Sequence, residues 1–163
     1  MTGILLTAVS LIAAASLLIA AIIILWPAGT GPATIDFLGR RGQLDREHAT
    51  FLVIIFSGAL GGVTHALRSL YWYVGNRDLR RSWLMLYACV PVVGAALALI
   101  VYIVVRGGLL SAQASSADVN PYGFSAVAAL VGLFSSEATT KLKQIFSTIF
   151  APAEEGRDRV PPA

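Results

Sequence analysis

Residues 51–73 read FLVIIFSGALGGVTHALRSLYWY, and this apolar stretch decides the fold class. As an α-helix it would be about 34 Å long at 1.5 Å per residue, enough to cross a hydrocarbon core of about 30 Å. It ends in Tyr71, Trp72 and Tyr73, and aromatic side chains of this kind gather at membrane interfaces. We therefore predict a membrane-spanning helix over residues 51–73.

The composition of the whole chain agrees with a membrane protein. Of its 163 residues, 56% are hydrophobic and only 13% are charged, whereas soluble domains have about 25% charged residues. Too little polar sequence remains for a separate soluble fold. We predict one all-α membrane domain over residues 1–150, followed by a disordered tail over 151–163 that is rich in proline and charge.

Three further apolar segments are candidate spans, and they cover residues 4–26, 83–105 and 122–140. The first is too long for the apolar core of a signal peptide and has no Lys or Arg before it, so we expect it to remain as a span. The last is uncertain in length. Residues 122–136 alone would suit a re-entrant segment, but a helix that continues to residue 140 is about 28 Å long and just spans. We predict the full crossing, and hence four transmembrane helices.

An amphipathic helix is predicted over residues 141–150. Apolar residues recur there at intervals of three and four, opposite a polar face; they are Leu142, Ile145, Phe146, Ile149 and Phe150. Such a helix lies on a membrane surface or packs against a partner. The mixed polar residues 28–48 predict a loop, with a short interfacial turn at 34–38, and residues 74–82 predict a short link between antiparallel helices.

The distribution of Lys and Arg predicts the orientation. With four crossings, one side carries seven of these residues and the other carries four, so the positive-inside rule places both termini in the cytoplasm. We expect a multi-pass protein of a bacterial inner (plasma) membrane. The basic residues expected to contact anionic lipid headgroups are Arg77, Arg80, Arg81, Lys141 and Lys143.

Small residues on span 51–73 predict close helix packing. Gly58 with Gly62 forms a GxxxG pattern, and Ser57 with Gly61 forms a second pair of small residues four apart. Another helix can approach either face closely. We favour packing within the chain over packing between subunits, and the sequence leaves open which helix is the partner.

Three polar residues within apolar segments are candidates for function: His65, Arg68 and Glu137. Arg68 either extends to lipid headgroups or pairs with Glu137 from the fourth segment, although Lys141 is a local alternative partner for Glu137. His65 either donates a hydrogen bond to a backbone carbonyl of a packed helix or acts as a pH-sensitive or pore-lining group.

No motif for catalysis, nucleotide binding or metal binding is present in the sequence. Cys89 is the single cysteine, and the cluster of Asp45, Glu47 and His48 is typical of a solvated helix start. The positive charges flank apolar segments instead of forming a basic arm. We therefore expect no enzyme, no metal or cofactor and no nucleic-acid partner.

Two classes of function fit these observations. The first is a small homo-oligomeric membrane protein that forms an ion channel or pore, because the chain is too small to enclose a conducting path alone. The alternative is a non-catalytic accessory or scaffold protein that recruits anionic lipid or a partner membrane protein through its basic rim and amphipathic helix.

Overall fold

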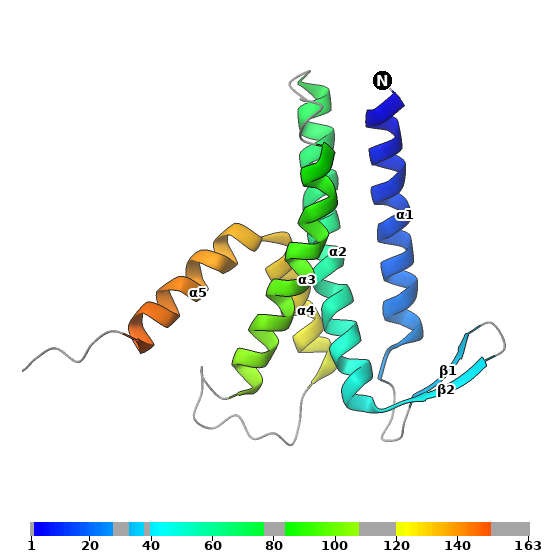
Figure 1. The fold of residues 1–163 in the computed structure, drawn as a ribbon, viewed down its shortest axis with the longest axis vertical. Coiled ribbons are helices and arrows are strands. Elements are labelled where there is room, and N and C mark those ends of the chain that lie inside the picture. Colours follow the sequence, from blue (N-terminus) through cyan, green and yellow to red (C-terminus); the bar gives the residue numbers. More distant parts are fainter. Residues whose placement is uncertain (1, 28–32, 38–39, 77–83, 108–119, 151–163) are drawn as a thin grey trace, which may run out of the picture.

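The computed structural model describes residues 2–27, 33–37, 40–76, 84–107 and 120–150. The described part of the chain is all-helical except for one β-hairpin (Figure 1). Its elements are α1 (Thr2–Ile24), β1 (Ala33–Phe37), β2 (Arg40–Leu44), α2 (Arg46–Gly75), α3 (Leu84–Arg106), α4 (Pro121–Leu133) and α5 (Ser135–Ile149). The predicted tail 151–163 and the basic residues Arg77, Arg80 and Arg81 lie outside the described residues.

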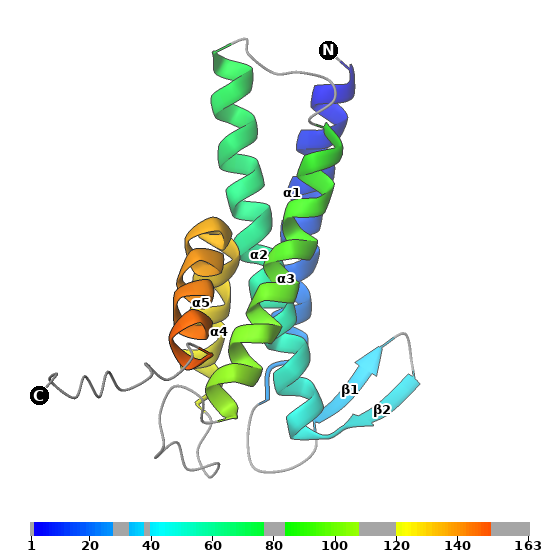
Figure 2. The same cartoon turned by 60° about the vertical axis from the view of Figure 1, so that its left-hand side comes forward.

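Helices α1, α2 and α3 are each long and apolar enough to cross a membrane, and they coincide with the predicted segments 4–26, 51–73 and 83–105. The three helices run side by side (Figures 1 and 2). One end of the bundle holds the start of α1, the end of α2 and the start of α3, and we call it the link end. The opposite end holds the hairpin and the starts of α2 and α4, and we call it the hairpin end.

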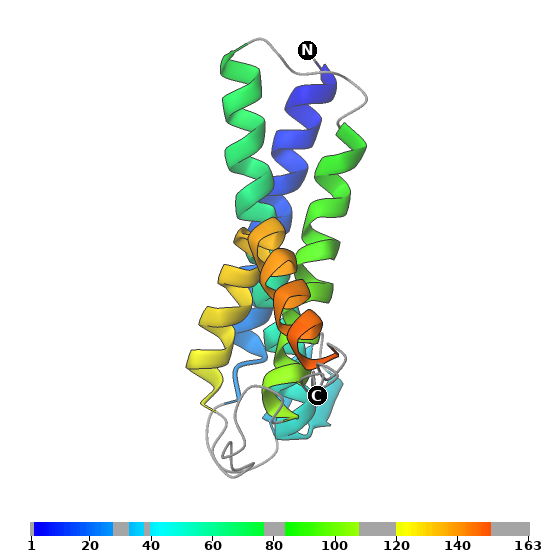
Figure 3. The same ribbon diagram turned by 90° about the vertical axis from the view of Figure 1, so that its left-hand side faces the viewer.

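The fourth predicted span is wrong as a single helix over residues 122–140. Helix α4 has 13 residues, or about 20 Å, and ends at Phe134, whose φ of −115° and ψ of 47° leave the helical region. Helix α5 then turns back toward the hairpin end (Figures 1 and 3). The predicted helix 141–150 is therefore the second half of α5.

The residues around this break explain where α5 begins. Ser135 and Ser136 have side chains that compete with helical backbone hydrogen bonds, and Glu137 lies in the first turn of α5, where a negative charge is favoured. This is the composition of a helix start. Hydropathy does not detect it, because the apolar residues of α4 run directly into it.

The predicted loop 28–48 contains a hairpin instead of an interfacial turn. Strands β1 and β2 pair antiparallel, from Ala33 opposite Leu44 to Phe37 opposite Arg40. The β-branched and aromatic residues of β1 favour this conformation. The hairpin projects sideways from the base of α2 (Figure 2).

Helix α2 is central and contacts α1, α3 and α4. Two buried clusters surround it. The cluster nearer the link end contains Leu11, Val63, Ala66, Leu70 and Tyr87. The cluster nearer the hairpin end contains Ile54, Ala98, Tyr102 and Ala128, with the ring of Tyr102 edge-on to the rings of Phe51 and Phe124 at centroid distances of 5.2 and 5.1 Å.

Four glycines allow α2, α3 and α4 to touch through their backbones, and we call Gly58, Gly62, Gly94 and Gly132 the glycine junction. A Cβ placed on Gly94 would lie 2.5 Å from the carbonyl oxygen of Gly58 and 3.2 Å from the Cα of Gly132. A Cβ placed on Gly62 would lie 2.7 Å from the carbonyl oxygen of Val90. The GxxxG face of α2 is therefore filled within the chain, by α3 and α4 together.

The second pair of small residues on α2 also packs inside the chain. Ser57 is buried, and a Cβ on Gly61 would overlap the carbonyl oxygen of Ala129 and lie 2.8 Å from the amide nitrogen of Leu133. The second half of α4 is thus held against α2. These contacts fix the position of the α4–α5 turn.

Candidate functional site

The early end of α4 leaves part of α2 uncovered, and a cavity of about 470 Å³ lies there. We call it the polar cavity. It is lined by His65, Arg68, Ser69, Tyr71, Trp72 and Tyr73 of α2 and by Leu133, Phe134 and Glu137 at the α4–α5 turn. The structure therefore brings the three polar candidates His65, Arg68 and Glu137 to one site.

His65 caps the broken helix. Its Nδ1 lies 3.1 Å from the carbonyl oxygen of Leu133, and because a carbonyl oxygen only accepts, the ring nitrogen must donate. In a continuous helix this carbonyl would accept from the amide of Glu137, but the break at Phe134 removes that partner. The hydrogen bond agrees with the interpretation of His65 as a donor to the backbone of a packed helix.

Glu137 is satisfied by its own helix. Its Oε2 accepts a hydrogen bond of 2.7 Å from the hydroxyl of Ser136, and its place in the first turn of α5 puts its charge at the positive end of the helix dipole. Local interactions therefore compensate much of the carboxylate charge.

Arg68 is in a different position. It lines the same cavity as Glu137, yet within the described part of the chain it forms no ion pair or hydrogen bond. The predicted pair between Arg68 and Glu137 is thus absent from this conformation, although both groups share one space.

A line of polar side chains continues from the cavity along α5. Glu137, Lys141, Gln144 and Thr148 are separated by four, three and four residues, so they share one face of the helix. All four are exposed, and we call them the polar stripe. The apolar residues Leu142, Ile145 and Phe146 are half-buried on the other side of α5.

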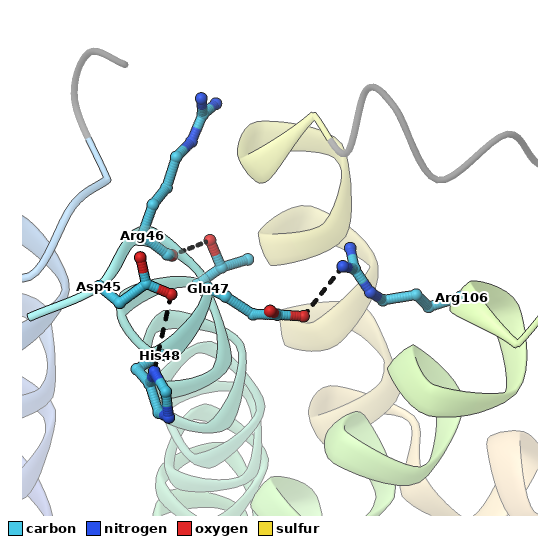
Figure 4. A network of polar contacts seen from close by, with 6 residues as sticks. Asp45, Arg46, Glu47, His48 and Arg106 are labelled. Atoms are coloured by element: carbon cyan, nitrogen blue, oxygen red, sulfur yellow. Dashed lines mark hydrogen bonds and ion pairs between the residues drawn. The ribbon is translucent and has the colours of Figure 1, made fainter. Parts of the chain in front are cut away.

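At the hairpin end, an ion pair joins α2 to α3 (Figure 4). Oε1 of Glu47 accepts a 2.9 Å hydrogen bond from Nη2 of Arg106. His48 contacts Asp45 at 3.8 Å and does not turn toward Glu47. No group of three metal-ligating side chains converges anywhere in the described residues, and the acidic cluster here acts as a helix start joined to the end of α3.

Two parts of the site are absent from the sequence-based predictions. The carbonyl of Leu133 became an acceptor because α4 ends there, and the Ser-Ser-Glu run at 135–137 was the available signal. The pairing of Glu47 with Arg106 could have been inferred from their places at the same end of two antiparallel helices.

No protein-family model, curated protein or solved structure matches the chain.

Proposed function

We propose that the protein self-associates to form a small ion-conducting pore, with the polar cavity and the polar stripe lining a hydrated path across the membrane. The observation that carries this proposal is the position of α5. The helix starts beside His65, about 21 Å along the span that begins at Phe51, and then runs back with its polar face exposed.

Lipid is a poor environment for this face. Thr148 is satisfied by its own helix, since its hydroxyl donates to the carbonyl of Gln144 at 3.0 Å. The ammonium of Lys141 and the side-chain amide of Gln144 have no such partner among the described residues. Unsatisfied polar groups at this depth each cost several kcal/mol in hydrocarbon. Facing the stripe of a second copy across a water-filled space removes that cost.

The polar cavity supports the same arrangement at the other half of the membrane. It extends toward the link end from the α4–α5 turn, whereas the polar stripe extends toward the hairpin end. Glu137 belongs to both. The two features thus form one polar route along the outside of a single chain, and a neighbouring copy is needed to separate this route from lipid.

The proposed assembly does not use the GxxxG face. Gly58 and Gly62 are occupied by α3 and α4 of the same chain. The exposed polar side chains that still need polar surroundings are those of α5, where no residue is buried. We therefore place the subunit contact along α5 and keep α5 as an amphipathic helix in this proposal.

The half-length α4 also changes the proposed orientation. With three full crossings, Arg40, Arg41, Arg46 and Arg106 belong to the segments at the hairpin end, whereas the sequence between α2 and α3 contains Arg77, Arg80 and Arg81. The positive-inside rule then favours a cytoplasmic hairpin end and an N-terminus on the opposite side of a bacterial inner membrane. Contact of the link arginines with anionic headgroups remains part of the proposal.

Cysteine accessibility in liposomes tests the pore. In a Cys89→Ala background, Gln144→Cys on the polar stripe should react with a charged thiosulfonate reagent, and the reaction should reduce ion flux. Ile145→Cys is the matched control, because its side chain is half-buried on the apolar side of α5. A strict monomer by light scattering that conducts no ions would refute the pore and favour the accessory or scaffold alternative.

A further inference from the structure

The polar route carries two full positive charges and one negative charge within the described residues. Arg68 lies in the polar cavity, Lys141 lies one turn along the polar stripe, and Glu137 lies between them. His65 uses one ring nitrogen to hold the carbonyl of Leu133. The charge balance of the route therefore depends on how far each of these three charges is already compensated.

Glu137 is compensated and Arg68 is not. The carboxylate of Glu137 accepts from Ser136 and sits at the positive end of α5. The guanidinium of Arg68 has five N–H donors, and none of them donates to another described residue. Arg68 is exposed at this cavity, and a cation without a protein partner in an apolar segment is stabilised by a counterion or by water.

Two other residues that line the cavity carry hydrogen-bond donors that an anion can use, whereas Glu137 adds a negative charge that Ser136 and the α5 dipole partly compensate. The two donor residues are Trp72 and Tyr71, which are 63% and 64% exposed and whose side chains carry an indole N–H and a phenol O–H. The cavity volume of about 470 Å³ is room for a monovalent ion with part of its water shell, since each water takes about 30 Å³.

From these features we infer that the polar cavity is a binding site for a small inorganic anion such as chloride, with Arg68 as its main contact, and that the site makes the pore anion-selective. The selectivity rests on the proposed pore, whereas the binding of an anion does not. A cation on the same route would have to pass Arg68 and Lys141, and both would repel it.

Binding is tested first, on the full-length protein in detergent. Replacing gluconate by chloride at constant ionic strength should raise the melting temperature of the wild type, because a ligand that binds only the folded state stabilises it. Arg68→Gln should abolish this rise, and Arg68→Lys should retain part of it. Arg46→Gln is the matched control: it removes the same charge at the hairpin end and should leave the rise unchanged. No rise in the wild type, or equal loss in both glutamine variants, would refute the anion site.

Selectivity is tested in planar bilayers with a potassium chloride gradient. The reversal potential of the wild type should lie close to the equilibrium potential of chloride. Arg68→Gln should lower the chloride-to-potassium permeability ratio by about tenfold, which is the order by which a charged cleft concentrates counterions. Lys141→Gln should lower it in the same direction and serves if Arg68→Gln does not fold. A pore that conducts but prefers potassium would refute the proposed anion selectivity and leave the pore itself standing. Chloride stabilisation without any conductance refutes the pore and leaves the anion site.

Discussion

A single methyl group on Gly132 should separate α4 from α2. A Cβ at this position overlaps the carbonyl oxygen of Gly58 and lies 2.9 Å from its carbonyl carbon and 3.0 Å from the amide nitrogen of Gly62. All three are backbone atoms of one helix, so they cannot rotate away as a side chain could. To restore ordinary contacts, α4 must move by about 1 Å, and close-packed interiors resist movements of this size.

The magnitude follows from two opposing terms. Overpacking of this kind costs about 1–3 kcal/mol, and an overlap with rigid backbone belongs at the upper end. Replacing glycine by alanine inside a helix stabilises the helix by up to about 1 kcal/mol, because alanine has the higher helix propensity. We therefore expect Gly132→Ala to lower the free energy of unfolding by about 2 kcal/mol.

Gly123→Ala is the matched control in the same helix. A Cβ on Gly123 has no neighbour within 4 Å, so only the helix-propensity term applies, and this variant should be unchanged or stabilised by up to about 1 kcal/mol. Unfolding in mixed micelles of increasing SDS fraction, followed by circular dichroism, measures both variants. If Gly132→Ala and Gly123→Ala unfold at the same SDS fraction, the backbone contact between α2 and α4 is not as described.

Three further predictions follow from the same structure. Tyr87→Phe should leave the free energy of unfolding unchanged or raise it by about 1 kcal/mol, because its buried hydroxyl has no hydrogen-bond partner in the described structure; a clear loss of stability would show that a partner exists. In the Cys89→Ala background and intact cells, Asn76→Cys should react with an impermeant thiol reagent and Gln43→Cys should not, and the reverse pattern would overturn the orientation. Arg68→Ala and Glu137→Gln should change the free energy of unfolding additively, within about 0.5 kcal/mol, since the two groups share a cavity without an ion pair; a larger coupling in the double-mutant cycle would contradict their separation.

The three long spans could be predicted because hydropathy and length decide them locally. Each contains enough consecutive apolar residues to cross the hydrocarbon core, and no distant residue needs to be known. The hairpin was not predicted because its pairing is not decided within one local segment. Residues 33–44 are short and polar, and their pairing depends on contacts across a turn, which the alternation of polar and apolar residues indicates only weakly.

The break at Phe134 could not be inferred from local hydropathy. The residues before it continue the apolar pattern, and no proline follows to end the helix. The Ser-Ser-Glu run favours a helix start there, and a residue far away in the sequence also contributes: the side chain of His65 of α2 donates a hydrogen bond to the carbonyl of Leu133, 68 residues later. The candidate residues His65, Arg68 and Glu137 were found from their polarity in apolar segments, but their meeting point was not.

The break in the helix and the polar residues of α2 account for one another. Without the break, α4 would continue past His65, the carbonyl of Leu133 would have its own helical partner, and α2 would have no space beside Arg68. Without His65, that carbonyl would be left without a partner at membrane depth, at a cost of several kcal/mol. The glycine junction supplies the remaining condition, because only backbone contact brings Leu133 close enough for the imidazole to reach it. A histidine and an arginine are therefore tolerated in this span because α4 stops beside the first and leaves a polar cavity around the second.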